Sequence, residues 1–160
     1  LAARLGLAVQ LDVKVAGVEE GALASLRRHD LLDRCFVSSF SLPILAAFAA
    51  VAPAVPRSFT YPEDRLGVSG SRLLRPAVAG GLAAMRALLP RRLPGWLHAA
   101  DADAVTLNTA VVSARAVAVC HDLGAAVLVW TVNDPALALI LVETGADGII
   151  SDDPGTFLSW

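Results

Sequence analysis

Hydrophobic positions along the chain repeat with period two in some segments and with helical spacing in others. In residues 5–17, the apolar side chains from Val9 to Val15 alternate with polar ones, which predicts a strand with two different faces. Residues 19–34 carry apolar side chains at helical spacing, with acidic residues early and basic residues late, as suits a helix dipole. The chain therefore opens with a strand followed by a helix.

The hydrophobic pattern predicts alternating strands and helices from here to the end of the sequence. Further strands are predicted at 35–40, 56–62, 104–108, 125–133 and within 146–154. Further helices are predicted at 42–53, 77–90, 109–124 and 134–145, with a long loop at 63–75 and a connection at 91–103. In the last helix, Asp134 is the expected N-cap, Pro135 the first helical residue and Gly145 the terminator.

Alternating strands and helices of this kind form either a (β/α) barrel or an open doubly wound sheet. No GxGxxG follows a strand and no GxxxxGK[ST] occurs, which weakens the nucleotide-binding open sheets. Polar residues recur where the strands end, and in a barrel those carboxyl ends form the active face. These residues are Lys14, Ser38, Ser39, Asn108, Trp130, Asn133, Ser151 and Asp152.

The predicted strands number six, whereas a closed barrel has eight strands and typically about 250 residues. The chain also opens on Leu1 rather than on a methionine. We therefore expect an α/β fold in which residues 1–160 form one partial domain of TIM (β/α)8 type. This domain would hold about the last six βα units of the barrel and lack the first two strands.

Composition narrows the possible partners. The sequence is 56% hydrophobic and 18% charged with a net charge of −2, so it shows no basic excess of the kind nucleic-acid-binding domains use. The longest apolar stretch, 41–55, is shorter than a transmembrane helix and is interrupted by two prolines, which favours a core helix. Cys35 and Cys120 have no metal-type spacing, so two buried thiols are expected.

Four segments resemble the glycerophosphodiester phosphodiesterase family, in the family's order. "LDVKV" is similar to its Glu-x-Lys strand, with Asp12 in the place of Glu, and "FVSSFSLPILAAF" to its Ser-Ser-Phe strand and helix. "GAAVLVWTVNDP" matches a family segment almost residue for residue, and "GADGIISDDP" resembles the family's ending, with Ser151 for the usual Thr. The last two segments are the specific ones.

This resemblance implies a TIM barrel that splits a glycerophosphodiester into glycerol 3-phosphate and an alcohol, with one bound Ca²⁺ or Mg²⁺. In the family, two histidines, one of them in a His-Arg-Gly motif, act as general acid and base. A Glu-x-Asp pair and the Glu of Glu-x-Lys hold the metal. Neither the His-Arg-Gly nor the Glu-x-Asp strand occurs in this sequence, and the "CHD" at 120–122 lies in a predicted helix. No catalytic residue is therefore assigned within the chain.

Three residues are the candidates for the site. Asp12 and Lys14 are two apart on one strand and point the same way, so Asp12 is a candidate metal ligand and Lys14 a candidate phosphate contact. The alternative is a purely structural ion pair, and Asp reaches roughly 1.5 Å less far than Glu. Trp130, at the end of a strand, is the candidate wall of the glycerol or alcohol pocket.

Other polar residues are assigned structural roles. Asn133 is expected to hold its loop, and of Ser38 and Ser39 one hydroxyl should face the pocket and the other bind backbone, since no nucleophile elbow is present. Asp152 and Asp153 are expected to cap a helix or loop before Pro154, with a metal site as the alternative. The three histidines are expected at the surface: His29, His98 and His121.

The prediction is a phosphoric diester hydrolase of glycerophosphodiesters in the complete parent, with this chain inactive alone. Two alternatives stay open. One is a non-catalytic binding or structural module, or one half of a split enzyme that pairs with a separate N-terminal half. The other is a different phosphate-binding barrel, for which "ETGADG" offers only a faint Gly-rich loop.

Overall fold

Six parallel strands form one curved sheet whose spatial order is the order of the chain, β1 to β6. The computed structural model describes residues 2–63 and 75–157, so most of the loop predicted at 63–75 lies outside the described residues. The strands are β1 (Val9–Asp12), β2 (Cys35–Ser39), β3 (Arg57–Tyr61), β4 (Ala104–Asn108), β5 (Ala126–Trp130) and β6 (Gly148–Ile149). The helices are α1 (Ala2–Leu5), α2 (Glu19–Arg28), α3 (Leu42–Val51), α4 (Arg75–Ala100), α5 (Ala114–Asp122) and α6 (Pro135–Thr144), with short 3₁₀ helices η1 (Leu32–Arg34) and η3 (Pro154–Phe157).

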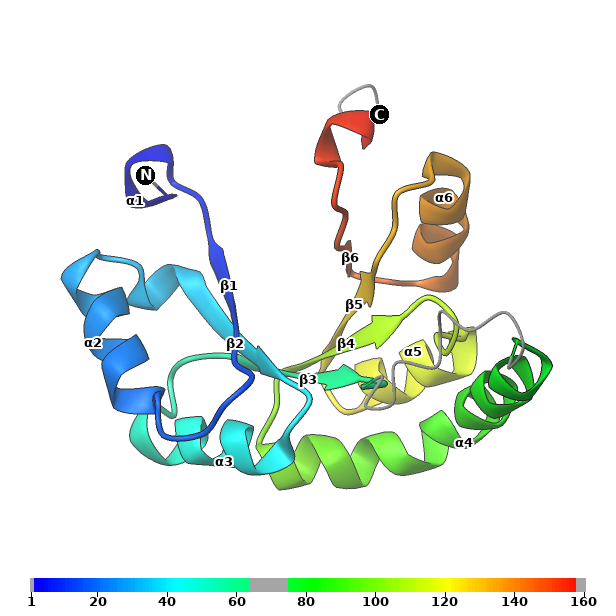
Figure 1. Ribbon diagram of the computed structural model, residues 1–160, viewed down its shortest axis with the longest axis horizontal. Helices are drawn as coiled ribbons and strands as arrows, with labels where there is room; N and C mark the ends of the chain where they lie inside the picture. Colours follow the sequence, from blue (N-terminus) through cyan, green and yellow to red (C-terminus); the bar gives the residue numbers. More distant parts are fainter. Residues whose placement is uncertain (1, 64–74, 158–160) are drawn as a thin grey trace.

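The sheet curls into part of a (β/α) barrel, which confirms the predicted fold class. Helices α2 to α6 lie on its outer side, β1 and β6 stand at its two edges, and both ends of the chain lie away from α3 and α4 (Figure 1). No helix among the described residues combines the length and apolarity of a membrane span.

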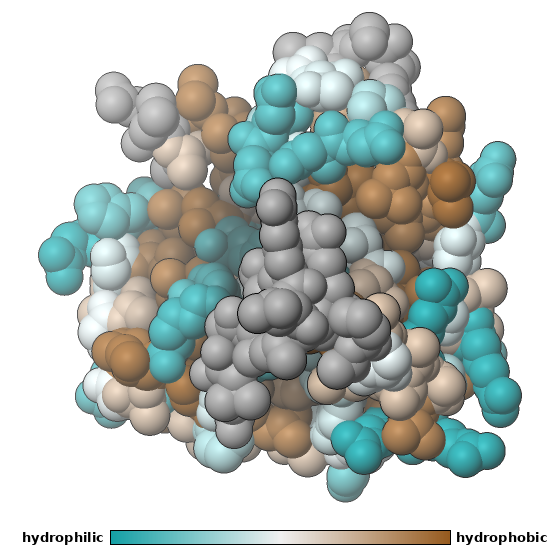
Figure 2. Space-filling model, turned by 45° about the vertical axis from the view of Figure 1, so that its right-hand side comes forward, coloured by the Kyte–Doolittle hydropathy of each residue, from teal (hydrophilic) through white to brown (hydrophobic). Residues whose placement is uncertain are grey.

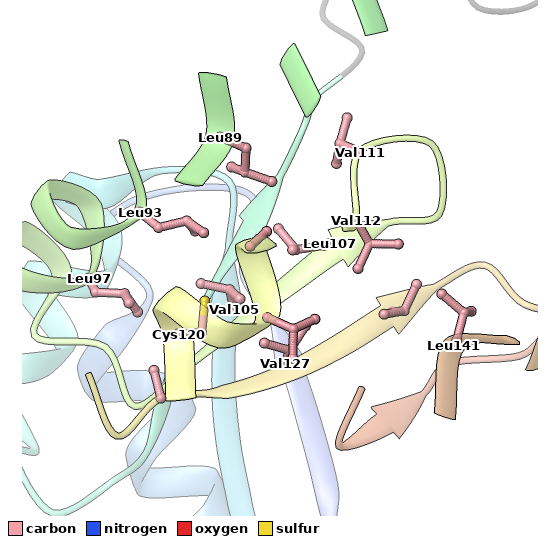
Figure 3. Packing of buried hydrophobic residues seen from close by; sticks show 14 of the residues in the cluster. Leu89, Leu93, Leu97, Val105, Leu107, Val111, Val112, Cys120, Val127 and Leu141 are labelled. Atoms are coloured by element: carbon pink, nitrogen blue, oxygen red, sulfur yellow. The ribbon is translucent and has the colours of Figure 1, made fainter. Parts of the chain in front are cut away.

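Alternation along each strand separates the two faces of the sheet. The side chains that face outward are mostly apolar and pack against the helices, as Figure 3 shows for Val105, Leu107 and Val127 under α4 and α5. A second cluster packs α2 and α3 on the first three strands, around Val37 and Phe48. The inward side chains are mostly polar, which suits a face that borders a binding site rather than a core. The polar inward residues are Gln10, Asp12, Ser38, Ser58, Thr60 and Thr106.

Helix α4 corrects the prediction made for its region. The sequence predicted a helix at 77–90 and a connection at 91–103, but one helix runs through Pro90 and Pro94 to Ala100. A proline inside a helix costs about 3 kcal/mol because it removes a hydrogen bond and clashes with the preceding turn. Three leucines four residues apart are buried against the sheet, and each contributes roughly 1.5–3 kcal/mol, which offsets the prolines. They are Leu89, Leu93 and Leu97 (Figure 3).

Other element boundaries shift by a few residues. β1 covers only the centre of the strand predicted at 5–17. The helix predicted at 19–34 breaks into α2 and η1, because the backbone at Asp30 turns to φ 54°. The helix predicted at 109–124 is α5, which begins after Ser113, whose hydroxyl caps the first turn. A side-chain cap at Ser113 thus starts α5 later, and a left-handed backbone at Asp30 ends α2 earlier, than the hydrophobic periodicity predicted.

The last helix follows its sequence signals closely. In α6 the carboxylate of Asp134 accepts a hydrogen bond from the backbone N–H of Ala136 at 2.9 Å, and Pro135 occupies the first turn. Gly145 ends the helix with a left-handed φ of 96°, a conformation that glycine adopts without a steric cost. The strand before it, predicted at 125–133, ends earlier, at Trp130.

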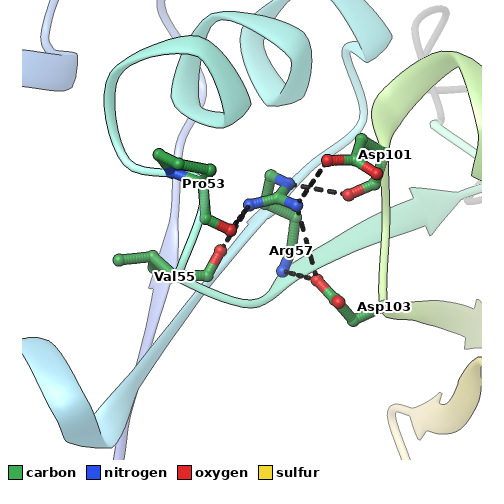
Figure 4. Close-up of polar contacts among 5 residues, drawn as sticks. All are labelled: Pro53, Val55, Arg57, Asp101 and Asp103. Atoms are coloured by element: carbon green, nitrogen blue, oxygen red, sulfur yellow. Dashed lines mark hydrogen bonds and ion pairs between the residues drawn. The ribbon is translucent and has the colours of Figure 1, made fainter.

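A buried arginine ties the amino end of β3 to the loop before β4 (Figure 4). Arg57 is 3% exposed, and its guanidinium donates to the carbonyls of Pro53 at 3.1 Å, Val55 at 2.6 Å and Asp101 at 2.8 Å. It also pairs with the Asp101 carboxylate at 3.0 Å, while the Arg57 backbone N–H donates to Asp103 at 2.9 Å. Every part of this guanidinium is thus engaged in holding two loops together.

Candidate substrate-binding site

The carboxyl ends of the strands surround a pocket of about 310 Å³ that brings the three predicted site residues together. Asp12, Lys14 and Trp130 all line it, although they come from opposite parts of the sheet. In barrel enzymes this end of the strands carries the binding and catalytic groups. The remaining lining residues are Gln10, Phe40, Thr60, Thr106, Thr131 and Ile150.

The side chains of Asp12 and Lys14 form an ion pair at the rim of this pocket. Lys14 Nζ lies 2.5 Å from Asp12 Oδ2, and both side chains remain about half exposed. The other Asp12 oxygen accepts a hydrogen bond from Ser38 Oγ at 3.1 Å, and Gln10 Nε2 donates to the same hydroxyl at 2.9 Å. A chain of contacts from the neighbouring strand therefore orients Asp12, and through it the ammonium group of Lys14.

Two aromatic rings support the opposite wall. Lys14 Nζ lies 4.3 Å from the centroid of the Phe40 ring, in the geometry of a cation–π contact. Phe40 meets Trp130 edge to face, with ring centroids 5.9 Å apart, and Trp130 Nε1 donates to the backbone oxygen of Thr106 at 3.2 Å. These contacts hold the indole at the rim, where it can act as a flat apolar wall.

The two serines of β2 have different partners, and the backbone contact that the sequence predicted for one of them is present. Ser38 Oγ lies among the pocket residues Gln10 and Asp12, whereas Ser39 Oγ donates to the backbone oxygen of Val13 at 2.7 Å. Ser39 Oγ also accepts from the N–H of Ser41 at 3.1 Å. Ser39 therefore joins the ends of β1 and β2, and the buried Ser38 positions Asp12 from behind the pocket wall.

Asn133 fastens the loop after β5 to the loop after β6. Its Oδ1 accepts from Ser151 Oγ at 2.9 Å and from the Asp152 N–H at 3.0 Å, and its Nδ2 lies 3.3 Å from an Asp152 oxygen. Asp153 accepts from the hydroxyl of Thr156 at 2.9 Å at the start of η3. The loop-holding role of Asn133 is confirmed. Asp152 bonds to Asn133 and the Asp153 carboxylate bonds to a side-chain hydroxyl, so the capping role of these two acids stays a prediction.

The described residues do not on their own make a site for Ca²⁺ or Mg²⁺. Ca²⁺ takes six to eight oxygen ligands and Mg²⁺ about six, several of them carboxylates or waters. Asp12 is the carboxylate that lines this pocket, and its two oxygens already contact Lys14 and Ser38. No group of three His, Cys, Asp or Glu residues suited to a metal ion occurs among the described residues. Metal ligation by Asp12 therefore stays a prediction.

Sequence reasoning overlooked the hydroxyls on the inner wall of the sheet. Thr60 and Thr106 line the pocket, and Ser58 pairs with Thr106 at 2.6 Å below them. The signal was present in "RSFTY" and "AVTLN", where polar residues alternate with apolar ones inside strands that were read as buried. A hydroxyl at the inward position of two adjacent strands was the available clue.

A second overlooked contact is the pair formed by His121 and Asp147 on the outer side. His121 is at the surface, as predicted, and its Nε2 lies 2.9 Å from Asp147 Oδ2, which also accepts from the Val127 N–H at 2.7 Å. Burial by itself would raise the pKa of Asp147, but the hydrogen bonds from Val127 and His121 lower it below its ordinary value. This carboxylate links α5 to the start of β5.

A larger cavity, of about 650 Å³, lies at the opposite, amino end of the strands. Its lining is mainly apolar and includes Ala8, Phe36, Ala104 and Leu128, while Arg57 beside it is bound to the surrounding loops. This end of a barrel contributes stability rather than chemistry. The smaller pocket at the carboxyl ends is therefore the candidate site.

Comparison with solved structures identifies the same fold in several phosphodiesterases. A structure from Silicibacter pomeroyi DSS-3, provisionally assigned as a glycerophosphoryl diester phosphodiesterase, is 27% identical with a TM-score of 0.65, over 93% of this chain and 48% of that one. An Oleispira antarctica phosphodiesterase in complex with the product sn-glycerol-3-phosphate is 22% identical, with a TM-score of 0.68, over 98% and 56%. A glycerophosphodiester phosphodiesterase from Thermotoga maritima is 18% identical, with a TM-score of 0.57, over 95% and 57%.

The chain thus spans about half the length of the solved structures it matches. Among curated proteins, no sequence matches it. The family model of the glycerophosphoryl diester phosphodiesterase family matches residues 8–156, which include every residue of the pocket. On this match, the chain belongs to the glycerophosphoryl diester phosphodiesterase family.

Proposed function

We propose that the protein binds glycerophosphodiesters in the pocket between Lys14 and Trp130 and takes part in their hydrolysis to glycerol 3-phosphate and an alcohol. The observation that carries this proposal is that Lys14 and Trp130 line one pocket at the carboxyl ends of the strands, with the Phe40 ring in contact with both. Family membership supplies the reaction class, a phosphoric diester hydrolase.

Lys14 is the proposed phosphate contact. It is the single lysine of the sequence, and its ammonium is positioned by the Asp12 carboxylate and the Phe40 ring. A phosphodiester carries one negative charge, and a lysine ammonium binds phosphate oxygen as a point charge with three donors. Because Lys14 remains about half exposed, it can reach a phosphate without leaving its partners.

Trp130 is the proposed wall for the carbon skeleton of the substrate. Its indole N–H is already bonded to the backbone oxygen of Thr106, so the ring face and edge remain for apolar contact. Asp12 orients Lys14, and with further oxygen ligands it would also bind the divalent cation that the family resemblance implies. The cation would then polarise the phosphate, and no step of our proposal depends on it.

Acid–base chemistry requires groups beyond those that line this pocket. General acids and bases typically contribute about 10² to 10⁴ each to the rate, and the His-Arg-Gly and Glu-x-Asp motifs do not occur in this sequence. We therefore propose that the 160-residue chain is inactive alone. Two further βα units, in the same or a complementing polypeptide, would pair with the free edges of β1 and β6 and bring these groups.

The first test is an activity assay on the purified chain. Incubation with glycerophosphocholine and Ca²⁺ or Mg²⁺ should release no glycerol 3-phosphate in a coupled enzymatic assay. Metal-dependent release by the chain alone would overturn the proposed inactivity.

The second test is binding of glycerol 3-phosphate by calorimetry. Lys14→Ala should weaken binding at least tenfold, since hydrogen bonds to charged groups contribute about 1.5–3 kcal/mol. Arg115→Ala, which removes an exposed cation on the outer helix α5, is the matched control and should bind as the wild type does. Acetylation of the single lysine should also slow when ligand is present. Equal binding by Lys14→Ala and wild type would remove the basis of the proposal.

A further inference from the structure

The hydroxyl of Thr60 is buried without a hydrogen-bond partner among the described residues. Thr60 is 6% exposed, and its Oγ1 is inaccessible to water. The neighbouring hydroxyls on the inner wall are all paired: Ser58 bonds to Thr106, and Ser38 bonds to Asp12 and Gln10. Buried hydroxyls in folded proteins nearly always have a partner, so the exception at Thr60 requires an explanation.

Thr60 lies at the junction of two cavities. It lines the pocket that contains Lys14 and Trp130, and it also lines a neighbouring cavity of about 460 Å³ bordered by Tyr61 and Trp96. Phe40 lines both cavities as well. Valine would fill the same space without the cost of a buried unpaired hydroxyl, so a threonine at this junction indicates a partner that arrives with the ligand.

The position of Thr60 relative to Lys14 selects which part of the ligand it meets. Lys14 follows β1 and Thr60 lies on β3, two strands away, which corresponds to about 10 Å across the sheet. Phe40 follows β2, the strand between β1 and β3, and its ring centroid lies 4.3 Å from Lys14 Nζ. If Lys14 binds the phosphate, the carbon skeleton of the ligand extends from it along Phe40, and Thr60 lies close to that skeleton rather than to the phosphate.

We propose that Thr60 is a specificity-determining residue whose hydroxyl forms a hydrogen bond with a hydroxyl of the glycerol moiety, so that the pocket discriminates glycerol phosphate from an alkyl phosphate. The inference rests on the proposed function of the pocket. A threonine hydroxyl can both donate and accept a hydrogen bond, and rotation about χ1 changes the direction in which it does so. A site that pairs a ligand hydroxyl rejects the analogue without it, because its own polar group is then left unpaired.

The test compares glycerol 3-phosphate with n-propyl phosphate, which has the same skeleton and phosphate but no glycerol hydroxyls. Wild type should bind glycerol 3-phosphate about tenfold more tightly, and Thr60→Val should reduce this preference to about twofold or less by weakening glycerol 3-phosphate alone. Thr60→Ser keeps the hydroxyl and should keep the preference. Thr144→Val, in the last turn of α6 where the hydroxyl bonds to the Ile140 carbonyl and does not line the pocket, is the control and should bind both ligands as wild type does.

Thermal unfolding without ligand provides an independent arm. Thr60→Val should melt at or slightly above the wild-type temperature, because it removes an unpaired buried hydroxyl; a lower Tm would show that the hydroxyl has a partner in the free protein and would overturn the inference. An unchanged preference for glycerol 3-phosphate in Thr60→Val would overturn it too. If the preference is unchanged in Thr60→Val while Lys14→Ala loses both ligands, only the role of Thr60 is refuted. A wild type that binds neither ligand refutes the proposed function as well.

Discussion

Arg57 offers the sharpest test of what holds this partial barrel together. Replacement by Met keeps an apolar stem of similar length and deletes the guanidinium, which donates to three backbone carbonyls and one carboxylate (Figure 4). Only the bond to the Val55 carbonyl is fully buried, and the other acceptors, on Pro53 and Asp101, can be hydrated after the replacement.

The magnitude follows from that difference in burial. An unsatisfied buried carbonyl costs about 1–3 kcal/mol, and each of two hydratable carbonyls loses about 0.5–1.5 kcal/mol. The ion pair with Asp101 adds little, because that carboxylate is 77% exposed and is screened by solvent. Arg57→Met should therefore lower the free energy of unfolding by about 2–6 kcal/mol and the Tm by roughly 2–4 °C for each kcal/mol.

Urea denaturation followed by circular dichroism at 222 nm measures this loss, given a two-state transition. Arg115→Met, at an exposed site on α5, is the control and should stay within about 0.5 kcal/mol of wild type. Asp101→Asn separates the ion pair from the carbonyl bonds and should cost less than about 1 kcal/mol. A loss below about 1 kcal/mol in Arg57→Met, or an equal loss in Asp101→Asn, would refute the reasoning.

Three further results are expected from local features of the fold. The pKa of Asp147 is lowered in the folded state, so Asp147→Asn should reduce the free energy of unfolding above about pH 4 by at most about 1 kcal/mol. The difference from wild type should vanish as the pH falls through the lowered pKa. A difference that persists in acid would contradict this. Burial, with a smaller effect of Asp147, raises the pKa of Cys120 to about 12, so at pH 8 a thiol reagent should modify it only after unfolding. Gly145→Ala should lower the free energy of unfolding by about 1 kcal/mol or more, since the residue has φ 96° and an added Cβ would lie 3.2 Å from Val117. Gly81→Ala, inside α4, should instead raise it by about 0.5–1 kcal/mol. Urea denaturation of each variant beside the wild type measures both changes.

The unpartnered side of α6 marks where this structure differs from a closed barrel. Leu139, Ile140 and Val142 are more than half exposed on it, and hydrophobic surface is visible on this side of the molecule in Figure 2. In a complete (β/α)8 barrel, helices from neighbouring units cover such positions. This exposure agrees with our proposal that further βα units complete the enzyme.

Much of the candidate site was predictable because its signals are local. Asp12 and Lys14 share a face through the two-residue period of a strand, and Trp130 ends a strand of unbroken apolar character. Thr60 and Thr106 were not found, because the alternation of hydroxyls with apolar residues in a strand shows two different faces but does not show which face becomes the interior wall; the direction in which the sheet curls decides that. The pairing of His121 with Asp147 was also missed, since it joins residues 26 apart in sequence.

By itself, the sequence determined the order of strands and helices, the class of fold, the ends of α6 and the family, because each depends on periodicity, caps or short motifs. Only the tertiary structure decided that Phe40 contacts both Lys14 and Trp130, that α4 continues through two prolines, and that Arg57 is buried with all three guanidinium nitrogens hydrogen-bonded. The physical reason is the same in each case. Burial and contact between distant strands contribute energies of several kcal/mol, which exceed local propensities and depend on how the whole sheet curls.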